Sequence, residues 1–114
     1  MDNIPLVSVI VTTYNRKYLL SKTINSILNQ AYKNFELIVV DNFSNYDFLS
    51  HIKSFNDQRI RPYQNINDGI IAKNRNFGIK KAKGSYIAFC DDDDLWYPEK
   101  LTVCSKFINE NTDL

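Results

Sequence analysis

The feature of this sequence with the clearest chemical meaning is a run of four carboxylates, Asp91 to Asp94. Neighbouring carboxylates repel one another by about 1 kcal/mol per close pair even in water, so an opposite charge should offset them. Magnesium and manganese prefer oxygen ligands, and magnesium usually keeps positions open for phosphate oxygens and water. The alternative is a solvated loop whose last acids cap a helix that begins near Pro98. The run therefore predicts a site for a cation and a diphosphate, or a helix cap.

Three further polar segments, residues 12–16, 41–45 and 65–69, each follow an expected strand. Together with the acidic run they contain hydroxyls, amides, an aromatic ring and carboxylates. A sugar, a base and a metal ion could all be bound by such a set. These segments act together only if the fold brings them to one place.

The order of the apolar runs indicates how the fold does so. Strands are expected over residues 6–11, 35–40, 59–64 and 85–90, and apolar residues with helical spacing lie in 19–31, 48–55 and 70–82. This alternation predicts a Rossmann-like three-layer α/β/α sandwich with a mostly parallel sheet, in which Pro62 marks an edge strand. We expect Gly84 to provide a left-handed cap after the third helix. Ligands of such sheets bind beyond the carboxyl ends of the strands, where the strand order reverses.

Length and composition limit the remaining possibilities. The 114 residues, 44% of them hydrophobic, predict a single domain over 1–114, and a net charge of +1 argues against nucleic acid as a partner. Three glycines, Gly69, Gly78 and Gly84, cannot form a G-x-G-x-x-G motif or a P-loop. The N-terminal residues do not resemble a signal peptide, so we expect a cytoplasmic protein. Cys90 and Cys104 are expected to be reduced and mostly buried.

Four stretches together resemble the donor-binding part of the family 2 inverting glycosyltransferases, which have the GT-A fold. These stretches are residues 7–16, 35–44, 72–79 and 84–94, with Trp96, Pro98 and Leu101 behind the last. The resemblance covers nearly the whole chain. It implies a nucleotide-diphospho-sugar donor, with a UDP-sugar expected, a manganese or magnesium ion, and sugar transfer with inversion. It also implies a role in cell-surface polysaccharide or glycan synthesis.

The resemblance further implies which residues bind the metal and the diphosphate. Asp91, Asp92 and Asp93 match the D-x-D signature, in which Asp93 would ligate the metal. Asp91 and Asp92 match positions near the ribose and metal-bound water, and Asp91 is also expected as a metal ligand. Arg75 would face the phosphates, although it could instead lie on a solvated helix face.

The same resemblance implies which residues bind the base and the ribose. Thr12 and Tyr14 would contact both, with the tyrosine ring beside the base, and Asp41 and Asn42 match the acidic pair that binds the base. Tyr14 could instead pack at the end of its strand, and Asp41 could cap the following helix. Asn42 and Phe43 replace the more usual acid and glycine of the family. That departure leaves the base preference open.

The catalytic base is expected beyond Leu114, together with the acceptor-binding half. The acceptor would be a sugar or a lipid-linked sugar, and a full-length form could lie at the inner face of the membrane. Alternatives are a non-catalytic nucleotide-binding module or inactive fragment, a phosphoryl-transfer domain, and an interaction scaffold. An apolar stripe of Val103, Phe107 and Ile108 predicts self-association through the C-terminal helix.

Overall fold

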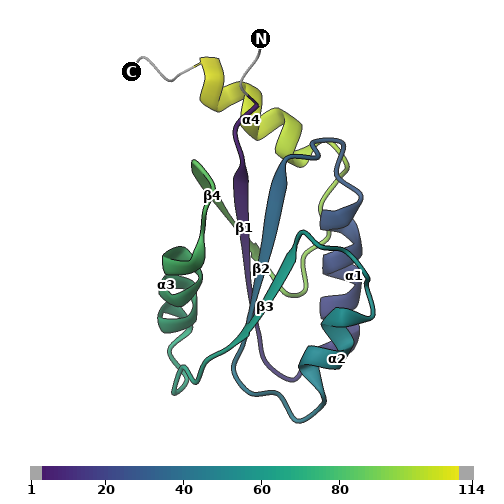
Figure 1. The fold of residues 1–114 in the computed structure, drawn as a ribbon, viewed down its shortest axis with the longest axis vertical. Coiled ribbons are helices and arrows are strands. Elements are labelled where there is room, and N and C mark those ends of the chain that lie inside the picture. The colour runs from purple at the N-terminus through teal and green to yellow at the C-terminus, as the bar shows by residue number, and fades with distance from the viewer. Residues whose placement is uncertain (1–3, 111–114) are drawn as a thin grey trace.

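A computed structural model describes residues 4–110, and the side chains of its last helix through Lys106. Its centre is a four-stranded sheet in the order β3-β2-β1-β4, and each neighbouring pair is parallel. The strands are β1 (Val7–Thr13), β2 (Phe35–Asp41), β3 (Ile60–Gln64) and β4 (Tyr86–Asp91). All four carboxyl ends therefore reach one rim, at the bottom of Figure 1.

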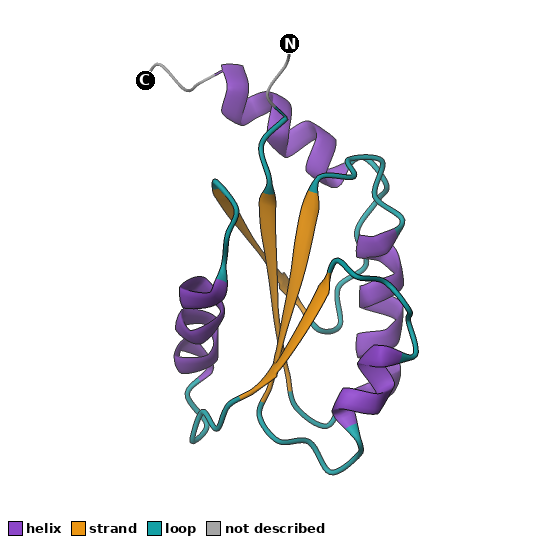
Figure 2. Ribbon diagram, in the orientation of Figure 1, coloured by secondary structure: helices purple, strands orange, loops and turns teal. Residues whose placement is uncertain are grey.

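Helices cover both faces of this sheet. They are α1 (Lys17–Leu28), α2 (Phe48–Lys53), α3 (Ile71–Lys81) and α4 (Lys100–Glu110). In Figures 1 and 2, α1 and α2 lie on one side of the sheet, α3 lies on the other, and α4 crosses the amino ends of the strands. The predicted α/β/α layering is confirmed. Within residues 4–110, we find no helix with the length and apolar character needed to cross a membrane.

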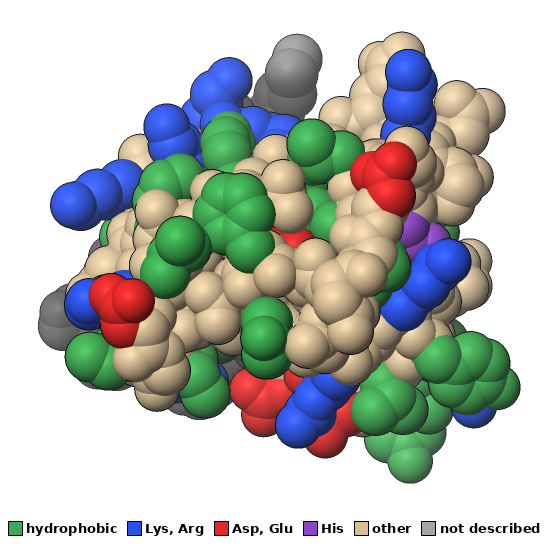
Figure 3. Space-filling view, turned by 90° about the horizontal axis from the view of Figure 1, so that it is seen from below, with side chains coloured by type: hydrophobic (Ala, Val, Ile, Leu, Met, Phe, Trp, Pro, Cys, Tyr) green, Lys and Arg blue, Asp and Glu red, His purple; other side chains and the backbone are tan. Residues whose placement is uncertain are grey.

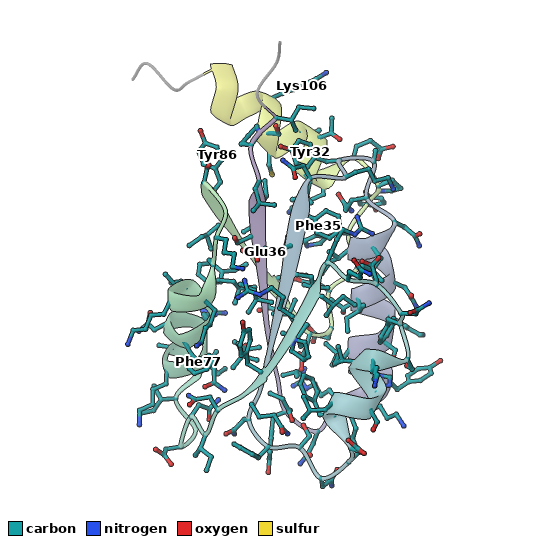
Figure 4. The ribbon with its side chains drawn as sticks, in the orientation of Figure 1. Tyr32, Phe35, Glu36, Phe77, Tyr86 and Lys106 are labelled. Carbon is teal, nitrogen blue, oxygen red and sulfur yellow. The ribbon has the colours of Figure 1, made fainter. Side chains whose placement is uncertain are left out.

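The β-branched runs form central strands because both of their faces are covered. Val9 and Val11 of β1 are fully buried in the larger core, which α1 and α2 cover. Ile10, between them, belongs to a smaller core that also contains Ile38 of β2. Phe77 of α3 packs against this smaller core (Figure 4). Alternation along each strand thus supplies both layers with apolar side chains.

The two outer strands each have one neighbour among the described residues. Pro62 lies in β3 opposite Val39, which confirms that β3 is an edge strand. On the other side, β4 pairs with β1 alone. Ile87 and Phe89 of β4 are 41% and 48% exposed, so the face of β4 on the side of α3 is only partly covered. β1 and β2, in contrast, are paired on both sides.

Two expectations about single residues were wrong. Gly84 does not have a left-handed backbone, and Ala82, with an extended backbone, caps α3 instead. A Cβ atom at Gly84 would lie 2.6 Å from the Leu6 carbonyl oxygen, so a close approach to β1 requires glycine there. Cys104 is exposed, whereas Cys90 is buried as expected. The phase of α4 buries Leu101 and turns Cys104 outward.

Candidate functional site

A cavity of about 470 Å³ opens at the carboxyl ends of β1 and β4. This is the position where the strand order reverses, since the chain places β2 and β3 on one side of β1 and β4 on the other. Its walls come from all four loops that follow the strands. The lining residues are Thr12, Thr13, Tyr14, Arg16, Asn42, Asn67, Gly69, Ile71, Arg75, Asp91, Asp92 and Asp93. Figure 3 views this end of the molecule and shows acidic groups gathered against basic ones.

Three carboxylates of the acidic run form a group with the chemistry of a metal site. Asp91, Asp93 and Asp94 each offer an oxygen, and these oxygens lie within 4.8 Å of one another. All three residues are exposed, so a cation bound to them could keep positions for water or a ligand. The set fits magnesium or manganese, which prefer carboxylate oxygens. Asp94 was not among the metal ligands expected from the sequence.

Asp92 turns inward and has a different environment from its neighbours. Its side chain is 11% exposed, and one of its carboxylate oxygens accepts a 2.9 Å hydrogen bond from the Thr13 hydroxyl. Burial raises the pKa of Asp92, while the hydrogen bond from Thr13 and the charge of Arg16 act in the opposite direction. Asp92 therefore anchors the acidic run to β1. Thr13 is the donor in this anchoring hydrogen bond.

Helix α1 fixes the segment that follows the acidic run. The Thr23 hydroxyl donates to the Asp94 carbonyl oxygen at 2.7 Å, and the Ser26 hydroxyl accepts the Trp96 backbone N–H at 3.1 Å. Gln30, fully buried near the end of α1, continues this support along the segment. The candidate metal ligands are therefore held by a strand on one side and a helix on the other.

Two arginines reach the acidic run from different elements. Arg16, which precedes α1, places Nη1 3.3 Å from oxygens of both Asp92 and Asp93. Arg75 of α3 lies 3.5 Å from Asp91, so it faces the cavity as expected and not only solvent. The sequence did not identify Arg16 as a site residue. A guanidinium beside these carboxylates could also bind a diphosphate, because its paired N–H groups match phosphate oxygens.

The loops after β1 and β2 hold each other in place. The Asn15 backbone N–H donates to the Ser44 hydroxyl at 2.7 Å, and the Asn15 side chain accepts the Asn45 N–H at 2.7 Å. Asn15 has a left-handed backbone, with φ of 52°. Tyr14, just before it, is 52% exposed and lines the cavity. The ring is therefore available to a ligand and is not packed at the strand end.

Asn42 connects the loop after β2 to the loop after β3. Its side-chain oxygen accepts the Asn67 backbone N–H at 2.9 Å, and both residues line the cavity together with Gly69. Gly69 has a φ of 80°, which glycine adopts without strain. The sequence placed Asn67 and Gly69 in a polar segment at the rim but assigned them no role. The position of this loop depends on the hydrogen bond from Asn67 to Asn42, which lies 25 residues earlier in the sequence.

Asp41 does not line the cavity in this structure, and its expected contact with the base stays a prediction. The residue is fully buried and is absent from the cavity lining. Its carboxylate accepts a hydrogen bond from the Ser44 backbone N–H at 2.9 Å, another from the Ser44 hydroxyl, and one from Gln64 at 3.2 Å. It does not cap α2 either, because Asp47 does. Asp41 thus shapes the loop that carries Asn42.

Phe43 occupies a backbone conformation that normally favours glycine. Its φ is 54°, and its ring is 53% exposed. A bulky side chain in the left-handed region costs about 1–2 kcal/mol. Phe43 therefore adds an exposed ring and some backbone strain to this loop.

Comparisons with known proteins identify the family of this chain. The family described as Glycosyl transferase family 2 matches residues 8–114. One relative in Escherichia coli, named UDP-Glc:alpha-D-GlcNAc-diphosphoundecaprenol beta-1,3-glucosyltransferase WfgD, is 40% identical over 98 residues, which are 86% of this chain and 39% of the relative. The chain spans between 15% and 44% of the length of eight curated relatives that it matches.

Solved structures show the same fold. TarS of S. aureus, residues 1–349 in complex with UDP-GlcNAc, superposes with a TM-score of 0.84 and 33% identity over 93% of this chain and 32% of that one. The mannosyltransferase PcManGT from Pyrobaculum calidifontis, in complex with GDP-Man and Mn2+, gives a TM-score of 0.84 and 25% identity, covering 96% and 34%. The chain therefore corresponds to about one third of each.

Proposed function

Because this chain belongs to glycosyl transferase family 2, we propose that it is the donor-binding part of a glycosyltransferase. The observation that carries the proposal is the cavity where the strand order reverses, whose walls combine Asp91 and Asp93 with Tyr14 and Arg75. A nucleotide-diphospho-sugar needs groups for a base, a ribose and a diphosphate, and this cavity offers all three kinds. A UDP-sugar is the expected donor, since UDP-sugars are named for WfgD and TarS.

The cavity residues divide between the two ends of such a donor. Tyr14 offers a half-exposed ring to the base, and Thr12 and Asn42 offer polar groups to the base and ribose. Arg75 and Arg16 offer guanidinium groups to the diphosphate. The base preference depends on Asn42, because Asp41 is occupied by other hydrogen bonds.

Asp91, Asp93 and Asp94 would hold a divalent cation, manganese or magnesium, and it would neutralise charge on the departing diphosphate. Manganese in the PcManGT structure supports this choice. In the proposed transfer, the bond between the anomeric carbon and the diphosphate oxygen breaks as an acceptor hydroxyl oxygen bonds to that carbon from the opposite face. The hydroxyl proton passes to a general base, which we expect beyond Leu114. The anomeric configuration inverts.

The acceptor and the cellular setting extend the proposal further. WfgD is named for transfer to a sugar on diphosphoundecaprenol, which supports a lipid-linked acceptor and a role in cell-surface glycan synthesis for this chain. A cytoplasmic enzyme lying peripherally at the inner membrane face would meet such an acceptor. Nucleic acid is not an expected partner.

Self-association through α4 stays a prediction. Val103 is 62% exposed, in line with it, while the side chains of Phe107 and Ile108 lie outside the described residues. Light scattering at high protein concentration tests this point. A monomer at all concentrations would contradict it.

Calorimetric titration of UDP with and without manganese tests the main proposal. We expect manganese to tighten UDP binding about tenfold, within the usual range of coupling between ligands, and Asp93→Ala to remove that gain. Glu99→Gln is the matched control, since Glu99 is exposed and outside the cavity. UDP affinity that does not respond to manganese would contradict the proposal. Metal-dependent binding without donor hydrolysis or transfer would favour a non-catalytic nucleotide-binding module.

A further inference from the structure

We propose that Arg16 is an internal counter-cation that opposes metal binding until a diphosphate arrives. Its guanidinium would neutralise Asp92 and Asp93 before the donor binds and would move to the diphosphate afterwards. The inference rests on the proposed function of the cavity. Arg16 would then have two roles, because it would act on metal affinity through Asp93 and would also bind the diphosphate directly.

The geometry places Arg16 in competition with a cation. One atom, Nη1, lies 3.3 Å from Asp92 Oδ1 and 3.3 Å from Asp93 Oδ2. Asp93 is also a member of the carboxylate group that fits a metal ion. While Arg16 engages an oxygen of Asp93, that oxygen is not free to coordinate a divalent cation. The cation would also lie close to the positive charge of the Arg16 guanidinium. Both effects weaken metal binding while Arg16 keeps this position.

The attachment of Arg16 is weak enough to be exchanged. The side chains of Arg16 and Asp93 are 49% and 50% exposed, and ion pairs of this kind contribute little to stability. Asp92, in contrast, has a separate hydrogen bond from buried Thr13, which reaches the carboxylate oxygen that Arg16 does not engage. Release of Arg16 therefore frees Asp93 without unfolding the acidic run.

A diphosphate is the partner that could take Arg16 away. Arg16 lines the same cavity as Arg75, and a guanidinium binds phosphate oxygens through two parallel N–H groups. Transfer of Arg16 from Asp93 to the diphosphate would open a metal ligand at the moment when a metal is needed. Donor and metal would then bind cooperatively, and metal binding without donor would be suppressed.

Manganese titration followed by electron paramagnetic resonance, on the 114-residue chain, tests the inference. Free manganese gives a signal that falls when the ion binds, so metal affinity is read without catalytic turnover. We expect Arg16→Gln to tighten manganese binding about three- to tenfold in the absence of nucleotide, because it removes a charge next to the ligands. The same variant should also bind UDP about tenfold more weakly than the unmodified chain does.

Two further variants separate a specific role from a general change in charge. Lys22→Gln removes the same charge from an exposed position of α1, and it should leave manganese affinity unchanged. Arg16→Lys retains the positive charge. Its manganese affinity without nucleotide should therefore remain close to that of the unmodified chain. If Arg16→Gln binds manganese no more tightly than the unmodified chain without nucleotide, or if Lys22→Gln tightens it equally, the inference is overturned. Failure of the unmodified chain to bind manganese with UDP present would instead refute the proposed function.

Discussion

Replacing Glu36 with glutamine should destabilise the fold strongly, because Glu36 is a buried charge with three hydrogen bonds. Its carboxylate, 9% exposed, accepts from the Ser8 hydroxyl, the Lys83 backbone N–H and Arg61 Nη1, each at 2.6 Å. A hydrogen bond to a charged group contributes about 1.5–3 kcal/mol, and a glutamine amide can accept fewer of the three. Losing one or two of them predicts a decrease of about 2–4 kcal/mol in the free energy of unfolding.

The same residue predicts how this loss depends on pH. Burial alone would raise the pKa of Glu36, but hydrogen bonds from Ser8, Lys83 and Arg61 outweigh it, so the pKa lies below its ordinary value. A carboxylate with a lowered pKa stabilises the folded state fully above its unfolded pKa of about 4.3. That stabilisation is lost as the pH falls through the folded pKa. The difference between the unmodified chain and Glu36→Gln should therefore shrink below about pH 4.3.

Urea unfolding followed by circular dichroism, at pH 7 and at steps down to about pH 3, measures both effects. Glu99→Gln is the control, because it removes a carboxylate from an exposed position. Figure 4 shows Glu36 on β2, within the sheet and away from the rim. A difference below about 1 kcal/mol at pH 7, or one that stays constant with pH, would refute the reasoning that the three hydrogen bonds stabilise a charged Glu36.

Three other outcomes follow from single contacts. Gly84→Ala should lower the free energy of unfolding by about 2–3 kcal/mol in urea melts, because its Cβ would lie 2.6 Å from a backbone carbonyl oxygen; an unchanged midpoint would contradict this. Thr13→Val removes the donor to buried Asp92 and should cost about 1–2 kcal/mol in the same assay. Burial raises the pKa of Cys90 to about 12, and the charges of Asp94 and Asp91 add to this effect. Cys104 is exposed, so a thiol reagent at pH 8 should react quickly with one cysteine per folded chain. Two fast-reacting thiols would disagree with the structure.

The strands were predictable because their signal is local. Runs of apolar residues predicted β1, β2 and β4 to within one or two residues. β1 extends through Thr12 and Thr13, which the sequence placed in a polar loop. Thr12 stays in the ladder because it has a partner on each side, Val40 of β2 and Asp91 of β4, whereas Thr13 is paired with Asp41 of β2.

Most of the predicted residues that line the cavity lie at or just after the end of a strand, and Arg75 of α3 was predicted from the family resemblance. Tyr14, Asn42 and Asp91 line the cavity as expected. Asp41 does not, because Ser44 and Gln64 engage its carboxylate, and sequence spacing carries no information on such partners.

Arg16 was missed for a related reason. It lies 76 residues from Asp92 in the sequence, and only the pairing of β1 with β4 brings the two together. Cys104 shows the same limit on a smaller scale. Its exposure depends on the rotation of α4 about its axis, which is fixed by the burial of Leu101 and not by the cysteine itself.

The candidate metal ligands lie at the end of β4 or just after it, and within residues 4–110 this strand pairs only with β1. Occupancy of the rim is therefore linked to local opening of the sheet. Detachment of β4 from β1 would carry Asp91 away from Thr12, its partner in the ladder. A ligand that bridges the loops after β1 and β4 must dissociate before that opening. Amide protons of β4 should therefore exchange with deuterium more slowly once the rim is filled, while those of β2, paired on both sides, should change little.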